Sequence, residues 1–416
     1  MISESFRLLK SKIHAAFSTT DRRAKIQDGD FIIGLLKATA DSSESFSLAS
    51  LRLSMCSFVG ETIGQSAFNE RMGTATLKNQ VQHTLKTLMG EAFRLQNASA
   101  SSLDIAQKLG VSRIIGVDSS IVSLWHGLAK YFSGTFTTAA LKLHLSTDLI
   151  SGSVQWLDLS SGTVHDSQKF PDITCGGLYI VDLGYWDFGL FQSIEKGGAF
   201  FLSRIKSNSN VTIAKVVAGN FSNSLIGTKL KDLVVKRRRS EVVEFLGQLS
   251  HKKQVLNVRV VGFWNIKERR YRWYTTNLNA SRKAISDLYR LRWQIELSFK
   301  SMKSAFNFDR IPTLSPNATT TLALIGVCHY VMSTILRLKS SQKIDSRTRS
   351  LSLLRSANMI RAFSYDIYSL LQSGYRMSAS LAKKIDNMLL KTIRSYHDPN
   401  VNNRMNTENR LGNVIS

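Results

Sequence analysis

The pattern of apolar positions changes twice along the chain. Up to about residue 108, apolar residues recur at three- to four-residue steps, as at Phe31 and Leu35, which predicts amphipathic helices. From Arg113 the apolar residues come in short runs that end at polar residues or glycine, which predicts strands interspersed with helices. Helical spacing returns from Ala284 to the end of the chain. We therefore expect an α/β fold with helical regions on both sides of a core.

The runs divide the chain into three regions. Residues 1–108 form a helical region, 109–336 the α/β core, and 337–416 a basic helical region whose Asn-rich last residues are expected to be a mobile tail. β-branched runs separated by basic turns predict a β-rich insertion at about 208–272. The run at 271–276 is then expected to return to the core as a strand.

One long helix is predicted from Ala284 to Phe306. Its apolar residues share one stripe that would fix the helix on the core: Leu288, Leu291, Ile295, Phe299, Met302 and Phe306. At about 100° per residue, four polar residues fall within about 60° of one another beside that stripe: Tyr289, Arg292, Glu296 and Lys303. Taken alone, Glu296 followed four residues later by Lys300 is what a solvated helix face normally shows.

The charge of the chain indicates a polyanionic partner. Lys and Arg number 55 and Asp and Glu 30, so the formal net charge is +25. This excess is larger than solubility requires, which favours nucleic acid over anionic lipid or ribosomes. A basic run inside the predicted insertion is expected to contact phosphate: Lys236, Arg237, Arg238 and Arg239.

Several classes of protein are disfavoured. Three widely spaced cysteines support neither a zinc knuckle nor a disulfide framework, and no histidine has the spacing of a metal ligand. The first 17 residues lack the apolar segment of a signal peptide. The longest apolar run, 322–336, is shorter than the roughly 20 residues that span a bilayer, so we predict a buried helix. A cytoplasmic protein without a membrane partner is expected.

Three motifs resemble blocks of one family. The polar row has the spacing Y-x2-R-x3-E-x6-K, which resembles the signature of the insertion sequence 4 family of bacterial DDE transposases. The segment 114–120, with Asp118 after an apolar run, resembles the first block of that family. The segment 179–186, where Gly-Tyr comes two residues after Asp182, resembles the second. Leu183 and the Ser119-Ser120 pair depart from the usual residues, but neither is a metal ligand.

The resemblance implies a ribonuclease H-like core interrupted by the β-rich insertion. It also implies that Asp118, Asp182 and Glu296 are the catalytic residues and hold two Mg²⁺ or Mn²⁺ ions. Three close carboxylates would repel one another, and hard cations with oxygen ligands relieve that repulsion. The implied activity is cleavage of DNA at terminal inverted repeats and transfer of the strands to target DNA, by cut-and-paste transposition.

The resemblance further implies contacts with DNA. Tyr289, Arg292 and Lys303 would hold phosphate near the scissile bond, Arg292 as a bidentate fork and Lys303 as a point charge. Trp293 and Trp273 could stack on a flipped base or simply pack in the core. The helical end regions would bind the inverted repeats, and a homodimer would pair the two ends. The protein would act at the bacterial nucleoid.

Two alternatives remain open at this point. One is a metal-dependent nuclease of the same fold that hydrolyses DNA without joining it. The other is a non-catalytic DNA-binding protein that represses transposition. The presence of all three carboxylates disfavours the repressor, and the Tyr-Arg-Glu-Lys row disfavours the nuclease.

Overall fold

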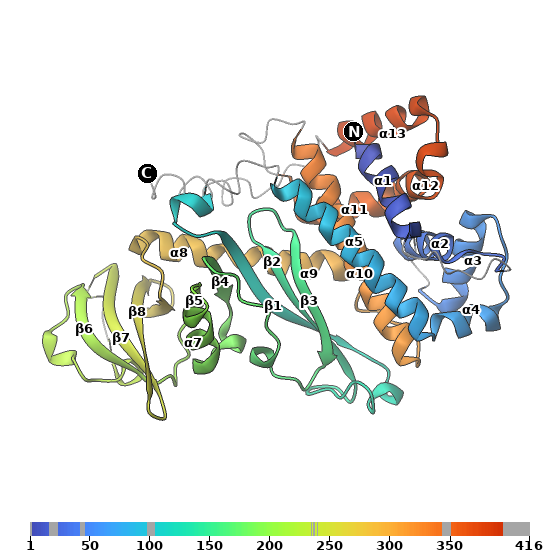
Figure 1. Cartoon of the computed structure of the whole chain (residues 1–416). Coiled ribbons are helices and arrows are strands. Elements are labelled where there is room, and N and C mark those ends of the chain that lie inside the picture. Colours follow the sequence, from blue (N-terminus) through green and yellow to red (C-terminus); the bar gives the residue numbers. More distant parts are fainter. Residues whose placement is uncertain are drawn as a thin grey trace.

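A computed structural model describes most of the chain. The described residues are 2–15, 24–41, 46–97, 105–233, 235, 238, 240–342 and 351–393. They form a mixed α/β architecture with one nine-stranded sheet (Figure 1). The predicted α/β class is therefore confirmed, whereas the predicted mobile tail lies outside the described residues.

The sheet has the strand order β3-β2-β1-β4-β5-β9-β8-β7-β6. The bounds are β1 (Arg113–Ser123), β2 (Ala140–Asp148), β3 (Val154–Ser161), β4 (Gly177–Val181), β5 (Phe200–Arg204), β6 (Val211–Ala218), β7 (Val242–His251), β8 (Gln254–Asn265) and β9 (Arg270–Thr276). Strands β1, β4 and β5 are parallel, and all other neighbours are antiparallel. The parallel centre is buried on both faces, as parallel strands require.

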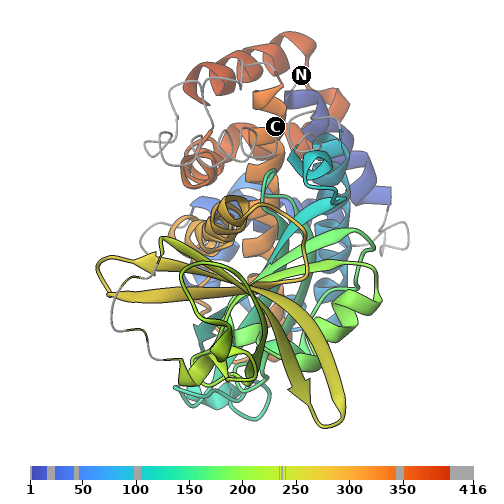
Figure 2. The same ribbon diagram turned by 90° about the vertical axis from the view of Figure 1, so that its left-hand side faces the viewer.

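The β-rich segment extends the core sheet. Thr276 of β9 pairs with Leu202 of β5 on one side and with Arg259 of β8 on the other. Strand β9 thus joins the core, as predicted for 271–276, and β8, β7 and β6 follow it outward. Figure 2 shows these yellow and yellow-green strands in front of the other strands. The segment at 208–272 is therefore continuous with the core through hydrogen bonds.

Helices cover both faces of the sheet. Their bounds are α1 (Ile2–Ala15), α2 (Asp28–Asp41), α3 (Leu48–Val59), α4 (Gln65–Met72), α5 (Ala75–Asn97), α7 (Phe188–Lys196), α8 (Arg282–Leu291), α9 (Trp293–Phe306), α10 (Pro316–Ser341), α11 (Leu353–Ala362), α12 (Ser364–Ser373) and α13 (Ala379–Ile393). Helix α7 packs with Val117 and Val181 on one face. Helices α5, α9 and α10 share the other face with Ile114 and Ile180, and α5 runs beside α10 (Figure 1).

The helices at the two ends of the chain are packed together. The carboxylate of Asp386 in α13 accepts hydrogen bonds from the backbone N–H and the hydroxyl of Ser3 in α1, at 2.6 and 2.8 Å. The guanidinium of Arg7 donates to the carbonyl of Gly374 at 2.9 Å. Apolar side chains of α1 to α5 and α9 to α13 belong to one continuous core. Within the described residues, the N-terminal helices therefore have no core of their own.

Helix α10 is the central helix of that core. It is long and apolar enough to cross a membrane by length and composition, but its most apolar stretch is fully buried inside the protein. The prediction that 322–336 is a buried helix is confirmed. Burial of an all-apolar helix on every side explains its composition without a lipid environment.

The prediction of one helix over 284–306 was wrong in one respect. Helix α8 ends at Leu291 and α9 begins at Trp293, with Arg292 between them. At this junction Arg292 N–H donates to the carbonyl of Tyr289, and Ile295 N–H to that of Arg292, both at 3.1 Å. Such three-residue hydrogen bonds tighten a helical turn. The apolar spacing could not reveal the break, because both helices bury the predicted stripe.

Candidate active site

Two aspartates lie side by side at the centre of the sheet. The parallel pairing of β1 and β4 ends with Val117 opposite Val181, so Asp118 and Asp182 are the next residues on adjacent strands. Beyond this point Asp182 starts a 3-10 turn. Strand β1 does not end at Asp118 as expected but continues to Ser123, because β2 goes on pairing with it. Asp118 is thereby held in a regular strand.

The junction of α8 and α9 faces these aspartates. The guanidinium of Arg292 donates from Nη1 to Oδ2 of Asp118 at 3.3 Å and from Nη2 to Oε1 of Glu296. The hydroxyl of Tyr289 donates to Oδ1 of Asp182 at 3.2 Å. Three carboxylates from β1, the end of β4 and α9 are thus brought together around one arginine and one tyrosine.

Burial changes the protonation chemistry of this cluster. It raises the pKa of the Asp118 carboxyl to about 7, and the negative charges of Asp182 and Glu296 add to the rise. The backbone N–H of Ser119 and the guanidinium of Arg292 act in the opposite direction. Burial lowers the pKa of Arg292, but the neighbouring carboxylates outweigh it, so that pKa is raised. The carboxylates therefore need positive charge nearby to stay ionised together.

The donor set of the cluster suits a hard divalent cation, because all its ligating atoms are carboxylate oxygens. Within the described part of the chain, no three His, Cys, Asp or Glu side chains are already gathered for a metal ion. The guanidinium of Arg292 forms ion pairs with Asp118 and Glu296. The chemical type of the donor atoms therefore fits a divalent cation, and two of the three carboxylates are paired with Arg292.

The fourth member of the polar row also lies at the site. The ammonium of Lys303 donates to the carbonyl of Ile121 on β1 at 3.3 Å. Lys303 lines a cavity of about 680 Å³ together with Asp118 and Glu296. All four residues of the predicted row are therefore within reach of the carboxylate cluster.

The other predicted DNA contacts have different surroundings. Trp293 is 59% exposed, so it is not a core residue. Trp273 is half-buried and stacks on Phe245 with ring centroids 5.6 Å apart, which favours the packing role. Arg238 is exposed and lies 3.6 Å from Glu241. Lys236, Arg237 and Arg239 lie outside the described residues.

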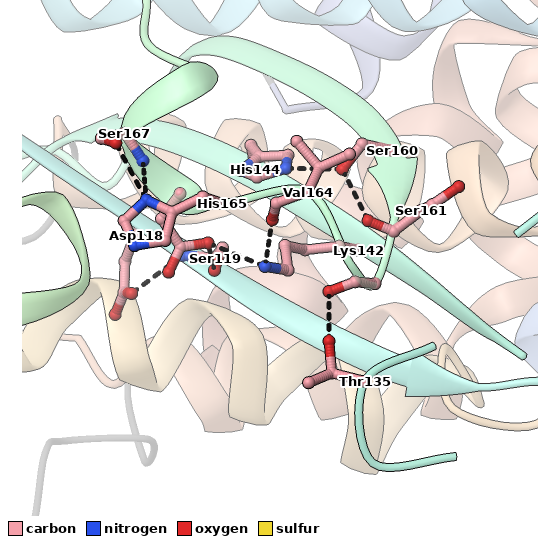
Figure 3. Close-up of polar contacts among 12 residues, drawn as sticks. Asp118, Ser119, Thr135, Lys142, His144, Ser160, Ser161, Val164, His165 and Ser167 are labelled. Carbon is pink, nitrogen blue, oxygen red and sulfur yellow. Dashed lines mark hydrogen bonds and ion pairs between the residues drawn. The ribbon is translucent and has the colours of Figure 1, made fainter. Parts of the chain in front are cut away.

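A layer beneath the cluster was missed in the sequence. The hydroxyl of Ser119 donates to Oδ1 of Asp166 at 2.8 Å, and the ammonium of Lys142 donates to the same oxygen at 3.1 Å. Lys142 also donates to the carbonyl of Val164 at 2.6 Å (Figure 3). A Cβ added to Gly184 would come within 2.6 Å of the Asp166 carboxylate. Asp166 therefore accepts hydrogen bonds from β1 and β2 and lies against the turn after Asp182. Lys142, a buried lysine in an apolar strand, was the available signal.

A family model described as a transposase DDE domain matches residues 110–332. Among curated relatives, the transposase for insertion sequence element IS1151 of Clostridium perfringens is 23% identical over 354 residues, which cover 72% of this chain and 73% of that protein. The transposase for insertion sequence element IS231B of Bacillus thuringiensis subsp. berliner is 24% identical over 364 residues, 75% of each chain.

A solved structure is also similar. It is the cryo-EM structure of the piggyBac transposase synaptic complex with hairpin DNA, with a TM-score of 0.45 and 11% sequence identity. The similarity covers 93% of this chain and 82% of that one.

Proposed function

Because the chain belongs to the family of DDE-domain transposases, of the insertion sequence 4 type, we propose that it cuts DNA at the ends of its own element and joins them to a target. The observation that supports this chemistry most is the convergence of Asp118, Asp182 and Glu296 on Arg292. A phosphoryl-transfer site needs such carboxylates together with a cation that can hold phosphate.

The proposal assigns roles to the regions of the chain. The strands β1 to β5 form a ribonuclease H-like core, with 208–272 as its β-rich insertion. The order β3-β2-β1-β4-β5 with two aspartates on adjacent parallel strands supports this assignment. The helical regions 1–108 and 337–416 bind the terminal inverted repeats, and a homodimer pairs the two ends before cutting. The protein works in the cytoplasm, at the bacterial nucleoid.

Divalent cations are used by DDE transposases generally, and here Asp118, Asp182 and Glu296 would hold them. Two Mg²⁺ or Mn²⁺ ions would supply activation of the attacking oxygen and stabilisation of the leaving oxygen. The buried strand position of Asp118 and the hydrogen bond from Tyr289 to Asp182 orient two of the three carboxylates. Asp166 and Lys142 support the strand that carries Asp118.

Arg292 has to exchange partners in this proposal. Its guanidinium pairs with Asp118 and Glu296. If Asp118 and Glu296 held cations, the guanidinium of Arg292 would be free to bind the scissile phosphate through its planar fork. Lys303, at the same site, adds a point charge to that phosphate. Exposed Trp293 is positioned next to Arg292 to stack on a displaced base.

A strand-transfer assay tests the proposal. The purified chain is incubated with Mg²⁺ or Mn²⁺, paired element ends and a circular target. A transposase gives products in which element ends are covalently joined to the target. A nuclease of the same fold would release nicked or cut ends without joining them, and a repressor would bind the ends without cutting. Either of these two results would overturn the proposed function.

A further inference from the structure

A basic groove leads away from the carboxylate cluster. It has a volume of about 680 Å³ and begins at Asp118 and Glu296. It continues along the second half of α9 past Lys303 and ends at Arg310 and Arg361. The groove therefore connects the catalytic core with α11, in the C-terminal helical region.

Local structure explains how the two arginines reach the groove. Asn307 ends α9 in the left-handed conformation, with φ at 49°, which an asparagine tolerates better than most residues. The chain turns there, and the backbone N–H of Arg310 donates to the carbonyl of Asn307 at 2.9 Å. Arg361 lies in the last turn of α11, a helix that packs directly on α9. Both arginines thus line the groove from elements that flank α9.

The charge of the groove is unbalanced. Its cations are Lys300, Lys303, Arg310 and Arg361. Among the residues that the structure describes, none of these four has a carboxylate partner, whereas Arg292 has two. Asp309 is the one acidic lining residue outside the carboxylate cluster in the described lining. Arginines and lysines without carboxylate partners suit a ligand that presents several negative charges in a row.

We propose that this groove binds the DNA strand that continues from the scissile phosphate, and that Arg310 and Arg361 hold its next phosphates. The inference rests on the proposed function, because the carboxylate cluster fixes where the scissile phosphate lies. A strand that passes the cluster needs a path onward, and the basic groove provides one. Arginine forks bind phosphate through two parallel hydrogen bonds. The strand can belong to the element end, to its flanking DNA or to the target.

The experiment combines protein variants with neutral phosphates. Arg310→Gln and Arg361→Gln are compared with the parent on DNA ends carrying a single methylphosphonate at successive positions beside the scissile phosphate. One arm measures single-turnover cutting of ends with flanking DNA, and a second measures joining of pre-cut ends to a target. Equilibrium binding of the same DNAs is measured in both arms. Lys196→Gln, which removes an exposed cation at the end of α7, is the matched control.

Each arginine variant is expected to slow at least one step about tenfold, the effect of losing one charged hydrogen bond. At one methylphosphonate position the rate of the parent should fall by the same factor, and the rate of the variant should not fall further. An effect in the cutting arm alone assigns the strand to flanking DNA, in the joining arm alone to the target, and in both arms to the element end. Lys300 lines the same groove, so it is expected to contribute and cannot serve as a neutral control.

Parent-like rates and affinities for both arginine variants would overturn the inference. It would also be overturned if the loss of rate caused by the substitution and the loss caused by the methylphosphonate multiplied at every position. If the parent does not cut at all, the proposed function fails. The binding measurements then still decide whether the groove contacts those phosphates. Arg310 is exposed and Arg361 is partly exposed, so both variants are expected to fold, and thermal unfolding checks this.

Discussion

Arg292 is the residue whose partners matter most for the chemistry. Its side chain is only 15% exposed and is paired with Asp118 and Glu296. Removing it would leave these carboxylates without their nearest cation while also removing a fork for phosphate. The first consequence leaves the carboxylates free for cations, whereas the second slows the reaction, because charge builds up on the phosphate during transfer.

Arg292→Ala is expected to lower the single-turnover rate of cutting at saturating DNA by about 100-fold. Its affinity for a long DNA end should change much less, because Arg292 is one phosphate contact among many. Lys303→Ala should behave in the same direction, and Lys196→Ala should match the parent. Rates for Arg292→Ala and Lys303→Ala equal to the parent rate would mean that the polar row is an ordinary helix face.

Asp166→Asn tests the layer beneath the cluster. The side chain of Lys142 is 9% exposed and loses its carboxylate partner in this variant, so the free energy of unfolding should fall by about 2 kcal/mol. Asp158→Asn breaks the ion pair between Asp158 and Lys169, whose side chains are 38% and 37% exposed. The free energy of unfolding should then fall by less than about 1 kcal/mol. Urea unfolding measures both. An equal fall in the free energy of unfolding in both variants would mean that Asp166 supports the site no more than a surface ion pair does.

Individual residues were predictable where a motif fixed their spacing. The row from Tyr289 to Lys303 was placed on one side of a helix from the sequence, and its members do gather beside Asp118 and Asp182. The partners of Arg292 within the site were not predictable, because a guanidinium can bind either a carboxylate or a phosphate. Asp166 was missed because its partners, Ser119 and Lys142, lie 47 and 24 residues away in the sequence.

Among the elements, α10 is joined to the two ends of the chain through one buried histidine. Nε2 of His329 lies 2.8 Å from the hydroxyl of Thr39 in α2, and Nδ1 lies 2.6 Å from the hydroxyl of Tyr368 in α12. The imidazole also stacks on Phe306 of α9 at 4.7 Å. Complete burial lowers the pKa of His329 to about 3. The folded protein therefore holds this histidine neutral.

This burial predicts a specific acid sensitivity. Below the unfolded-state pKa of about 6.5, the unfolded chain takes up a proton at His329 that the folded chain does not. The free energy of unfolding should thus fall as pH decreases from about 6.5 towards 3. In His329→Gln the free energy of unfolding should fall less steeply with decreasing pH. The slope should be smaller by up to about 1.4 kcal/mol per pH unit, the value for one proton. Urea unfolding at several pH values checks this, and an unchanged slope would contradict it.

The elements differed in how far their sequence predicted them. The strand predicted at 271–276 lies at Arg270–Thr276, so its run of residues was enough to place it. The pairing of β5 with β9 was not predictable, since it joins residues 70 to 74 positions apart. The break at Arg292 was also invisible, because both helices keep the same buried stripe.

For the whole molecule, the net charge of +25 predicts that affinity for DNA depends steeply on salt concentration. If six to ten phosphates are neutralised, affinity should fall by roughly a thousandfold or more between low and physiological salt. Titration of an element end at several salt concentrations measures this. A nearly constant affinity would mean that the basic surface is not the DNA-binding surface.

The shared core of the terminal helices was the largest feature that sequence could not predict. Ser3 and Asp386 lie 383 residues apart in the chain and form two hydrogen bonds. No local pattern encodes such a contact. The consequence for function is that α11, which lines the groove with Arg361, is fixed to the N-terminal helices through α12 and to the catalytic helix α9 directly.

We propose that the carboxylates of Asp118, Asp182 and Glu296 hold the cations for phosphoryl transfer, and mapping of the cut positions on the element ends with Mn²⁺ tests this role. The parent should cut at defined phosphates at both ends. Asp118→Asn, Asp182→Asn and Glu296→Gln should each abolish cutting and bind the same ends with affinity close to that of the parent. Parent-like cutting by any one of these variants would contradict the account of the site.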